Sequence, residues 1–171
     1  MSILLGNTEQ AGRESMQEKD GFIQDHAGRI AAIIEKNDRL IALFGMKIQD
    51  VGPGRAVVAM SVGEDHINSA QVCHGGTIFS LADVAFALAC NSHGSLALAI
   101  DMSISFLRPV SVGESITASC IEKHRGRRLG SYHIEVTNKS EQVVALLKAT
   151  AFVTDQTLKE TTDFSSRQNS G

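Results

Sequence analysis

The chain has 171 residues, 43% of them hydrophobic and 20% charged, which is enough apolar material for one folded domain. Sixteen Lys and Arg against nineteen Asp and Glu give a net charge of −3, which disfavours a nucleic-acid binder. The three cysteines are an odd number, so a disulfide scaffold is disfavoured and a cytoplasmic location is expected. No membrane association is expected, because the longest apolar run, Val84 to Cys90, is far shorter than a span.

The N-terminal part of the chain changes character near Phe22. Residues 1–21 are polar without a clear period, which predicts a flexible segment. From Phe22 to Phe44, apolar residues recur at steps of three and four, the pattern of an amphipathic helix. The polar run Lys36-Asn37-Asp38 predicts a break in this helix.

Period-two alternation then replaces the helical pattern. Met46 and Ile48 alternate with polar residues, and Arg55 to Val62 is rich in β-branched residues, so two short strands are predicted. Gly52-Pro53-Gly54 is a strong turn signal between them. The following residues, 63–73, are predicted to form a loop.

The segment from Thr77 to Cys90 is apolar almost all the way round, so it predicts a helix that is buried on most sides. Four strand-like stretches follow it, separated by turn signals; they are 96–107, 114–123, 129–137 and 142–153. A flat sheet on one side could not bury such a helix, whereas a strongly curved antiparallel sheet wrapped around it could.

The sequence therefore predicts an α+β domain over residues 22–154, with a flexible tail over 155–171. In this domain a long central helix is wrapped by a curved antiparallel sheet, and an N-terminal helical segment precedes it. The unclosed edge of such a sheet invites pairing with a second copy.

Asp83 is the most unusual residue of the buried helix, because it is the one charged residue between His74 and His93. A buried carboxylate without a partner is costly, and unexplained buried charges often mark functional sites. The alternative is a structural role, in which Asp83 lies at a helix edge and pairs with Arg108 or a backbone donor.

Gly75 and Gly76 stand at the start of the same helix. Glycines there let a ligand approach free backbone N–H groups, which can stabilise a carbonyl oxygen that gains negative charge. Gly75 and Asp83 are eight positions apart, or about 12 Å along a helix, so one reacting carbon cannot touch both. Two antiparallel copies of the helix would bring Gly75 of one copy near Asp83 of the other.

Positive charge is concentrated in the run Lys123 to Arg128, which includes Arg127 and Arg128 and reads as a hairpin turn. Arg108 is a second candidate for binding phosphate groups on a ligand. The cysteines and histidines match no paired zinc motif, so no metal is expected.

The segment from Asn68 to Asn91, NSAQVCHGGTIFSLADVAFALACN, resembles the hotdog-fold acyl-CoA thioesterases of the PaaI type, which are linked to phenylacetate degradation. The stretch SISFLRPVSVGESITA continues the resemblance, which covers residues 25–154. The resemblance implies a hotdog fold. It also implies a homodimer joined edge to edge, or a homotetramer made of two such dimers.

The resemblance also assigns roles by motif position. Asp83 is implied to be the catalytic carboxylate, and Gly75 the residue whose N–H polarises the thioester carbonyl. Asn68 is implied to position water or substrate, and His74 to have a supporting role. Some relatives place a water-orienting serine on the strand after the helix, where this chain has Ala99.

The expected function is hydrolysis of an aryl- or phenylacetyl-type acyl-CoA without a cofactor, with Asp83 as general base or nucleophile. Gly76, Arg108, Arg127 and Arg128 are expected to contact the substrate or its CoA moiety. One alternative is a hotdog dehydratase or hydratase that recruits His74. Another is a regulator that binds acyl-CoA without turnover, although residues 1–40 are too acidic for a DNA-binding arm.

Overall fold

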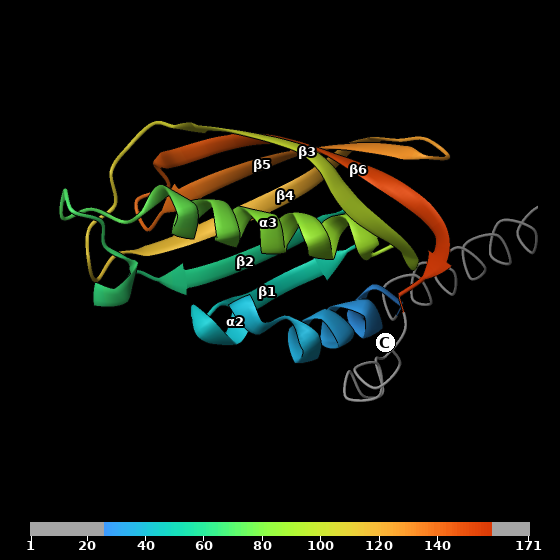
Figure 1. Cartoon of the computed structure of the whole chain (residues 1–171), viewed down its shortest axis with the longest axis horizontal. Helices are drawn as coiled ribbons and strands as arrows, with labels where there is room; N and C mark the ends of the chain where they lie inside the picture. The colour runs from blue at the N-terminus through green and yellow to red at the C-terminus, as the bar shows by residue number, and fades with distance from the viewer. Residues whose placement is uncertain (1–25, 159–171) are drawn as a thin grey trace, which may run out of the picture.

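The computed structural model describes residues 26–158, and Figure 1 shows α3 lying across one face of a curved sheet. The elements are the N-terminal helical segment (residues 26–37), α2 (Arg39–Leu43), β1 (Lys47–Gly52), β2 (Arg55–Ser61), the 3₁₀ helix η1 (Glu64–His66), α3 (Gly75–Asn91), β3 (Ser95–Phe106), β4 (Ser115–Arg125), β5 (Leu129–Asn138) and β6 (Val143–Thr157).

The six strands form one sheet in the order β1-β2-β4-β5-β6-β3, and every neighbouring pair is antiparallel. Each pair except β2 with β4 contains a register irregularity, and such bulges increase the local twist and bend a strand. The sheet therefore curves around α3, and the predicted α+β architecture is confirmed.

The predicted strands lie where the alternation placed them, with one difference at the C-terminal end. The strand β6 continues to Thr157, three residues past the expected domain end at 154, because its last residues pair with the start of β3 at Ser95. The flexible segment predicted for residues 1–21 and most of the predicted tail, from residue 159 on, lie outside the described residues.

The helix α3 is buried on most of its surface, as its apolar sequence predicts. Leu81, Ala85 and Leu88 are fully buried against the sheet, and the Phe86 ring meets Tyr132 edge-on at 5.1 Å between centroids. A narrow stripe on the other side of α3 is less buried; it consists of Gly75, Gly76, Phe79, Ser80, Asp83 and Ala87. This stripe points away from the sheet, so it is the part of α3 that can meet a ligand.

The predicted break in the N-terminal helix is confirmed at Asp38. The helical segment ends at residue 37, and Asp38 adopts an extended conformation and becomes the N-cap of α2. Its Oδ1 accepts a hydrogen bond from the Leu40 N–H at 2.9 Å. The side chain thus satisfies one of the N–H groups that a new helix leaves unpaired.

Asn91 fastens the end of α3 to the start of β3. Its Nδ2 donates to the carbonyls of Ala87 and Ala97, and its Oδ1 accepts from the Ala97 N–H at 2.9 Å. The side chain is buried, with 4% of its surface exposed. The register of β3 against β6 shifts between Ser95 and Ala97. At this irregularity the Asn91 amide, rather than another strand, forms hydrogen bonds with the backbone of Ala97.

The substitution Asn91→Leu is expected to lower the free energy of unfolding by about 2–4 kcal/mol, because the buried N–H and carbonyl of Ala97 lose their partner. Urea denaturation followed by circular dichroism measures this. Asn138→Leu is the matched control, since Asn138 accepts hydrogen bonds from Ser140 and Gln142 in a turn that water can reach. Equal losses of unfolding free energy in the two variants would contradict the stabilising role of the Asn91 hydrogen bonds.

Candidate active site

Asp83 lies on the wall of a cavity of about 450 Å³ between the N-terminal helical segment, α3 and the start of β3. The walls are mostly apolar; they include Ile33, Ile34, Phe86, Ala87, Leu96 and Leu98. The polar side chains among the lining residues are Asn37, Asp38, Asp83 and Asn91. Ala99 lines the same cavity. The cavity therefore presents one half-buried carboxylate of α3 to an apolar space.

The Asp83 carboxylate makes no hydrogen bond or ion pair with any residue that the structure describes. Arg108, the structural partner considered from the sequence, instead donates to the Val143 carbonyl at 2.5 Å. Burial raises the pKa of the Asp83 carboxyl above its usual range, and the negative charge of Asp38 raises it further. Such a group binds a proton more readily than an exposed aspartate does.

The start of α3 exposes a backbone donor at Gly75. His74 is the N-cap, and its Nδ1 accepts from the Gly76 N–H at 3.1 Å. The Gly75 N–H makes no hydrogen bond to a described residue, as expected in the first turn of a helix. Of the two glycines, Gly75 therefore offers the free N–H, whereas the N–H of Gly76 is satisfied by the cap.

The side chain of Phe106 packs against Gly75, so a larger residue at position 75 would require this exposed ring to shift. A Cβ atom built on Gly75 would lie 2.9 Å from the Cζ atom of Phe106, closer than real Cβ contacts come. Phe106 is the last residue of β3, and 51% of its surface is exposed. Its ring thus lies against the backbone that carries the free N–H.

Asn68 organises the loop before α3. Its Oδ1 accepts from the N–H groups of Ala70 at 2.9 Å and Val72 at 3.4 Å, and its backbone N–H donates to the Val72 carbonyl. Gln71, inside this turn, has a φ of 62°, a left-handed conformation that costs energy for a residue other than glycine. The oxygen of Asn68 is used by the loop, while its Nδ2 makes no hydrogen bond to a described residue.

Within one protomer the structure does not bring Gly75 and Asp83 together. The two residues are two turns apart on α3, and Gly75 is absent from the walls of the Asp83 cavity. Their separation along the helix is about 12 Å, as the sequence spacing indicates.

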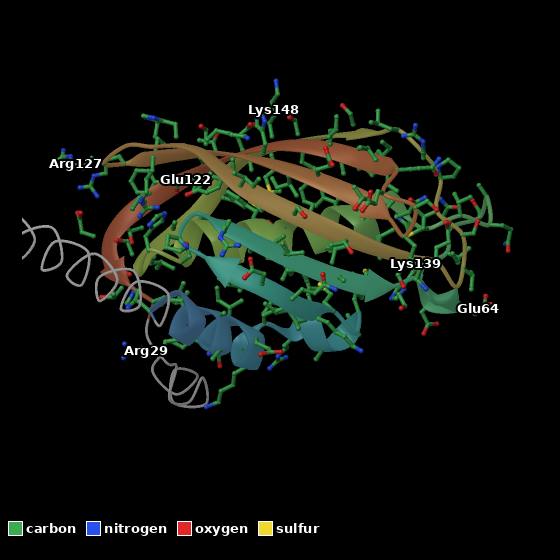
Figure 2. The ribbon with its side chains drawn as sticks, turned by 180° about the vertical axis from the view of Figure 1, so that it is seen from behind. Arg29, Glu64, Glu122, Arg127, Lys139 and Lys148 are labelled. Carbon is green, nitrogen blue, oxygen red and sulfur yellow. The ribbon has the colours of Figure 1, made fainter. Side chains whose placement is uncertain are left out.

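The basic candidates also lie apart. Arg108 follows Phe106 and is therefore near the N-terminal end of α3. The β4–β5 hairpin lies at the other end, where Arg125 donates to the Cys90 carbonyl at 3.3 Å. Figure 2 shows Arg127 at the hairpin tip, at the opposite end of the molecule from Glu64. One protomer therefore cannot use Arg108 and this hairpin on the same phosphate group.

The two hairpin arginines differ in their partners. Arg128 forms an ion pair with Asp155 at 2.8 Å, whereas Arg127 has no ion pair with a described residue.

Between residues 26 and 158, no group of three His, Cys, Asp or Glu side chains is placed to hold a metal ion. No helix in that range is long and apolar enough to cross a membrane.

Sequence patterns alone did not identify Asp38 or the isoleucines of the N-terminal helical segment as part of this cavity. Asp38 is 45 positions before Asp83, and its local signal is that of a helix cap. Ile33 and Ile34 have the spacing of ordinary core residues. Only the packing of the segment against α3 and β3 places them on the cavity wall.

Comparisons with known proteins agree with this architecture. The family model of the thioesterase superfamily matches residues 70–145. The acyl-coenzyme A thioesterase PaaI of Escherichia coli K12 is 43% identical over 113 residues, which are 66% of this chain and 81% of the relative.

Solved structures extend the likeness over more of the chain. The structure of the E. coli PaaI protein matches with a TM-score of 0.78 at 38% identity, covering 80% of this chain and 99% of that one. A protein of Streptococcus mutans UA159, solved bound to acetyl-CoA, matches with a TM-score of 0.64 at 28% identity, covering 66% and 91%. These matches confirm the predicted hotdog fold and the resemblance to the PaaI type. The chain therefore belongs to the thioesterase superfamily.

Proposed function

We propose that this chain hydrolyses acyl-CoA thioesters to the free acid and CoA, with Asp83 as the catalytic carboxylate. The observation that carries the proposal is Asp83 itself, an unpaired carboxylate of an apolar helix on the wall of an apolar cavity. Membership of the thioesterase superfamily and the activity named for the E. coli relative support a thioester as the bond that is broken.

Two routes use Asp83 in its ionised form. As a general base, it takes a proton from water while the water oxygen attacks the carbonyl carbon. The tetrahedral intermediate then collapses, the C–S bond breaks, and the CoA thiolate leaves and is protonated. As a nucleophile, a carboxylate oxygen attacks the carbonyl and expels the thiolate, and water then hydrolyses the mixed anhydride. In both routes a donor on the carbonyl oxygen stabilises the developing negative charge.

We infer that this donor is the Gly75 N–H of a second copy of the chain. Gly75 of the same copy is about 12 Å from Asp83 along α3, too far to act on one carbon. Two antiparallel α3 helices would place the free N–H of one copy opposite the carboxylate of the other. The strand β3, which pairs with β6 on one side alone, offers the edge for such pairing.

The walls of the cavity favour a compact apolar acyl group. Ile33, Ile34 and Phe86 offer apolar surface to such a group, and the volume of about 450 Å³ is within the usual range of ligand pockets. One relative's structure is named for the phenylacetic acid degradation operon, which supports an aryl or phenylacetyl group.

For the CoA phosphates, Arg108 is the better candidate. Only one of its guanidinium contacts, to the Val143 carbonyl, is formed within the described chain, so most of its five N–H donors are available. In the hairpin, Arg128 is already paired with Asp155. Arg127 has no ion pair with a described residue, and a single exposed arginine binds phosphate weakly.

The substitution Arg108→Ala is expected to raise KM for a CoA thioester by roughly fivefold or more with kcat nearly unchanged, because phosphate contacts are similar in ground and transition states. The double variant Arg127→Ala/Arg128→Ala is expected to have the smaller effect. An N-acetylcysteamine thioester, which lacks the phosphates, is the control substrate and should be indifferent to both changes. An equal loss on the two substrates would show that the arginines are structural.

Thiol release from a panel of acyl-CoAs tests the proposed function. We expect turnover of aryl and phenylacetyl thioesters to exceed that of acetyl and long-chain ones, since the cavity is apolar and has a volume of about 450 Å³. No thiol release from any member of the panel, with the protein folded and able to bind acyl-CoA, would favour the non-catalytic regulator instead.

A further inference from the structure

A second carboxylate faces the same cavity as Asp83. Asp38 comes from the junction between the N-terminal helical segment and α2, and it lines the cavity together with Asp83. Both side chains are half-buried. Two like charges on the walls of one apolar space repel each other, and the fold holds them there at a cost.

The local structure fixes where Asp38 stands. Its Oδ1 accepts from the Leu40 N–H, which holds the side chain at the start of α2. Its backbone N–H donates to the Ile34 carbonyl at 2.8 Å, so the residue is tied to the helical segment as well. The carboxylate is therefore held on the cavity wall rather than free to turn to solvent.

Among the described residues, no cationic side chain lines the cavity to offset the two negative charges. Among the described lining residues, the titratable groups are Asp38, Asp83 and the thiol of Cys90. Burial raises the pKa of Cys90 to about 12, so this thiol is neutral at neutral pH. The start of β3 contributes the apolar run Leu96 to Ala99. The cation that approaches from β4 is Arg125, which donates a hydrogen bond to the Cys90 carbonyl. Its guanidinium is also 4.0 Å from the Glu122 carboxylate, so part of its positive charge is neutralised there.

We propose that Asp38 is a positioning residue of the site, whose charge acts across the cavity on Asp83 and makes that carboxylate a stronger base or nucleophile. The inference rests on the proposed function, and it holds for either route. When Asp83 takes a proton from water, or forms an anhydride, its negative charge is consumed and the repulsion is relieved. An apolar acyl group that displaces water from the cavity would strengthen the repulsion before the reaction begins.

The capping role of Asp38 can be separated from its charge by two substitutions. Asp38→Asn removes the charge but keeps an oxygen that caps α2, since Asn and Asp are equally good N-caps. Asp38→Glu keeps the charge but places the carboxylate one methylene farther from the Leu40 N–H. The temperature of unfolding should depend on whether the side chain still caps α2. The pH dependence of catalysis should depend on whether the side chain is charged.

The test is the pH profile of kcat/KM for each variant, with a ¹³C NMR titration of the Asp83 carboxyl. For Asp38→Asn we expect the acidic limb, and the NMR titration of Asp83, to move to lower pH. The plateau rate should fall by less than about tenfold, because a weaker base is a poorer catalyst. For Asp38→Glu both titrations should stay near those of the wild type.

An unchanged acidic limb in Asp38→Asn, or equal shifts in the Asn and Glu variants, would overturn the inference. Neither result would affect the proposed function, which depends on Asp83. If Asp83→Asn itself keeps full turnover, the proposed chemistry fails, and the NMR titration still reports whether Asp38 acts on Asp83.

Discussion

Asp83→Asn is expected to lower kcat by at least roughly a hundredfold, because the amide can neither accept a proton from water nor attack a thioester. The substitution is nearly isosteric, and Asp83 makes no hydrogen bond or ion pair with a described residue, so the fold should be kept. The measurement is steady-state thiol release, with circular dichroism and light scattering as checks on folding and assembly.

Asp65→Asn is the matched control, since Asp65 is an exposed aspartate of η1 outside the cavity. It should leave kcat unchanged. Near-normal turnover by a folded Asp83→Asn protein would contradict both routes proposed for the reaction.

The same variant should be more stable than the wild type at neutral pH. Burial and the charge of Asp38 raise the pKa of Asp83, so the folded chain holds this proton more tightly than the unfolded chain does. The resulting stabilisation is fully present below the unfolded pKa of about 3.9 and is lost as the pH rises through the higher folded pKa. An asparagine at position 83 does not ionise, so the variant does not lose stability as the pH rises. Its Tm should exceed that of the wild type at pH 7, with the difference shrinking toward pH 4.

The arrangement of helix and sheet could be predicted from the sequence because its signals are local. The apolar helix from Thr77 to Cys90 cannot be exposed, and short alternating strands after it supply a sheet. The helix break at Asp38 was likewise readable, since a polar run interrupts a three- and four-residue period. The spacing of apolar residues reflects which side of a single helix or strand is buried, and these features are determined mainly by that local pattern.

The side-chain contacts that join one element to another were not predictable in this way. The Asn91 amide forms hydrogen bonds with Ala97, and Glu122 accepts one hydrogen bond from the Tyr132 hydroxyl at 2.7 Å. Nothing in the residues around Asn91 distinguishes an amide that binds backbone from one that faces water. The same holds for Asp38 and Asp83, which meet only because the N-terminal helical segment packs beside α3.

For the candidate site, sequence spacing predicted a separation and the structure agrees with it. Gly75 and Asp83 are on one helix, and no folding of the rest of the chain can shorten the distance between them. In contrast, nothing in the sequence separates Arg108 from Arg127 and Arg128 in space. That separation comes from strand direction, which places their turns at opposite ends of α3.

The edge strand β3 is the part of the sheet at which a second copy of the chain can pair. This strand has 12 residues and carries exposed apolar residues such as Leu98 and Ile100, with 55% and 58% of their surfaces exposed. The strand has one charged residue, Asp101, and neither lysine nor proline, so its edge remains available for pairing with a second copy. If two copies pair there, each completes the other's site with a Gly75 N–H.

Ile100→Lys should therefore prevent pairing, because a lysine on an edge strand disfavours the addition of another strand. We expect light scattering to show the mass of a monomer, and kcat/KM to fall by roughly a hundredfold or more, the usual loss when a donor to the oxyanion is removed. Leu43→Lys is the control: Leu43 on α2 is 72% exposed, and a lysine there should change neither mass nor rate. A fully active Ile100→Lys monomer would show that one copy contains a complete site. A stable, active Ile100→Lys dimer would instead place the interface on another face. The mass therefore tests pairing at β3, and the rate of a monomer tests whether a second copy completes the site.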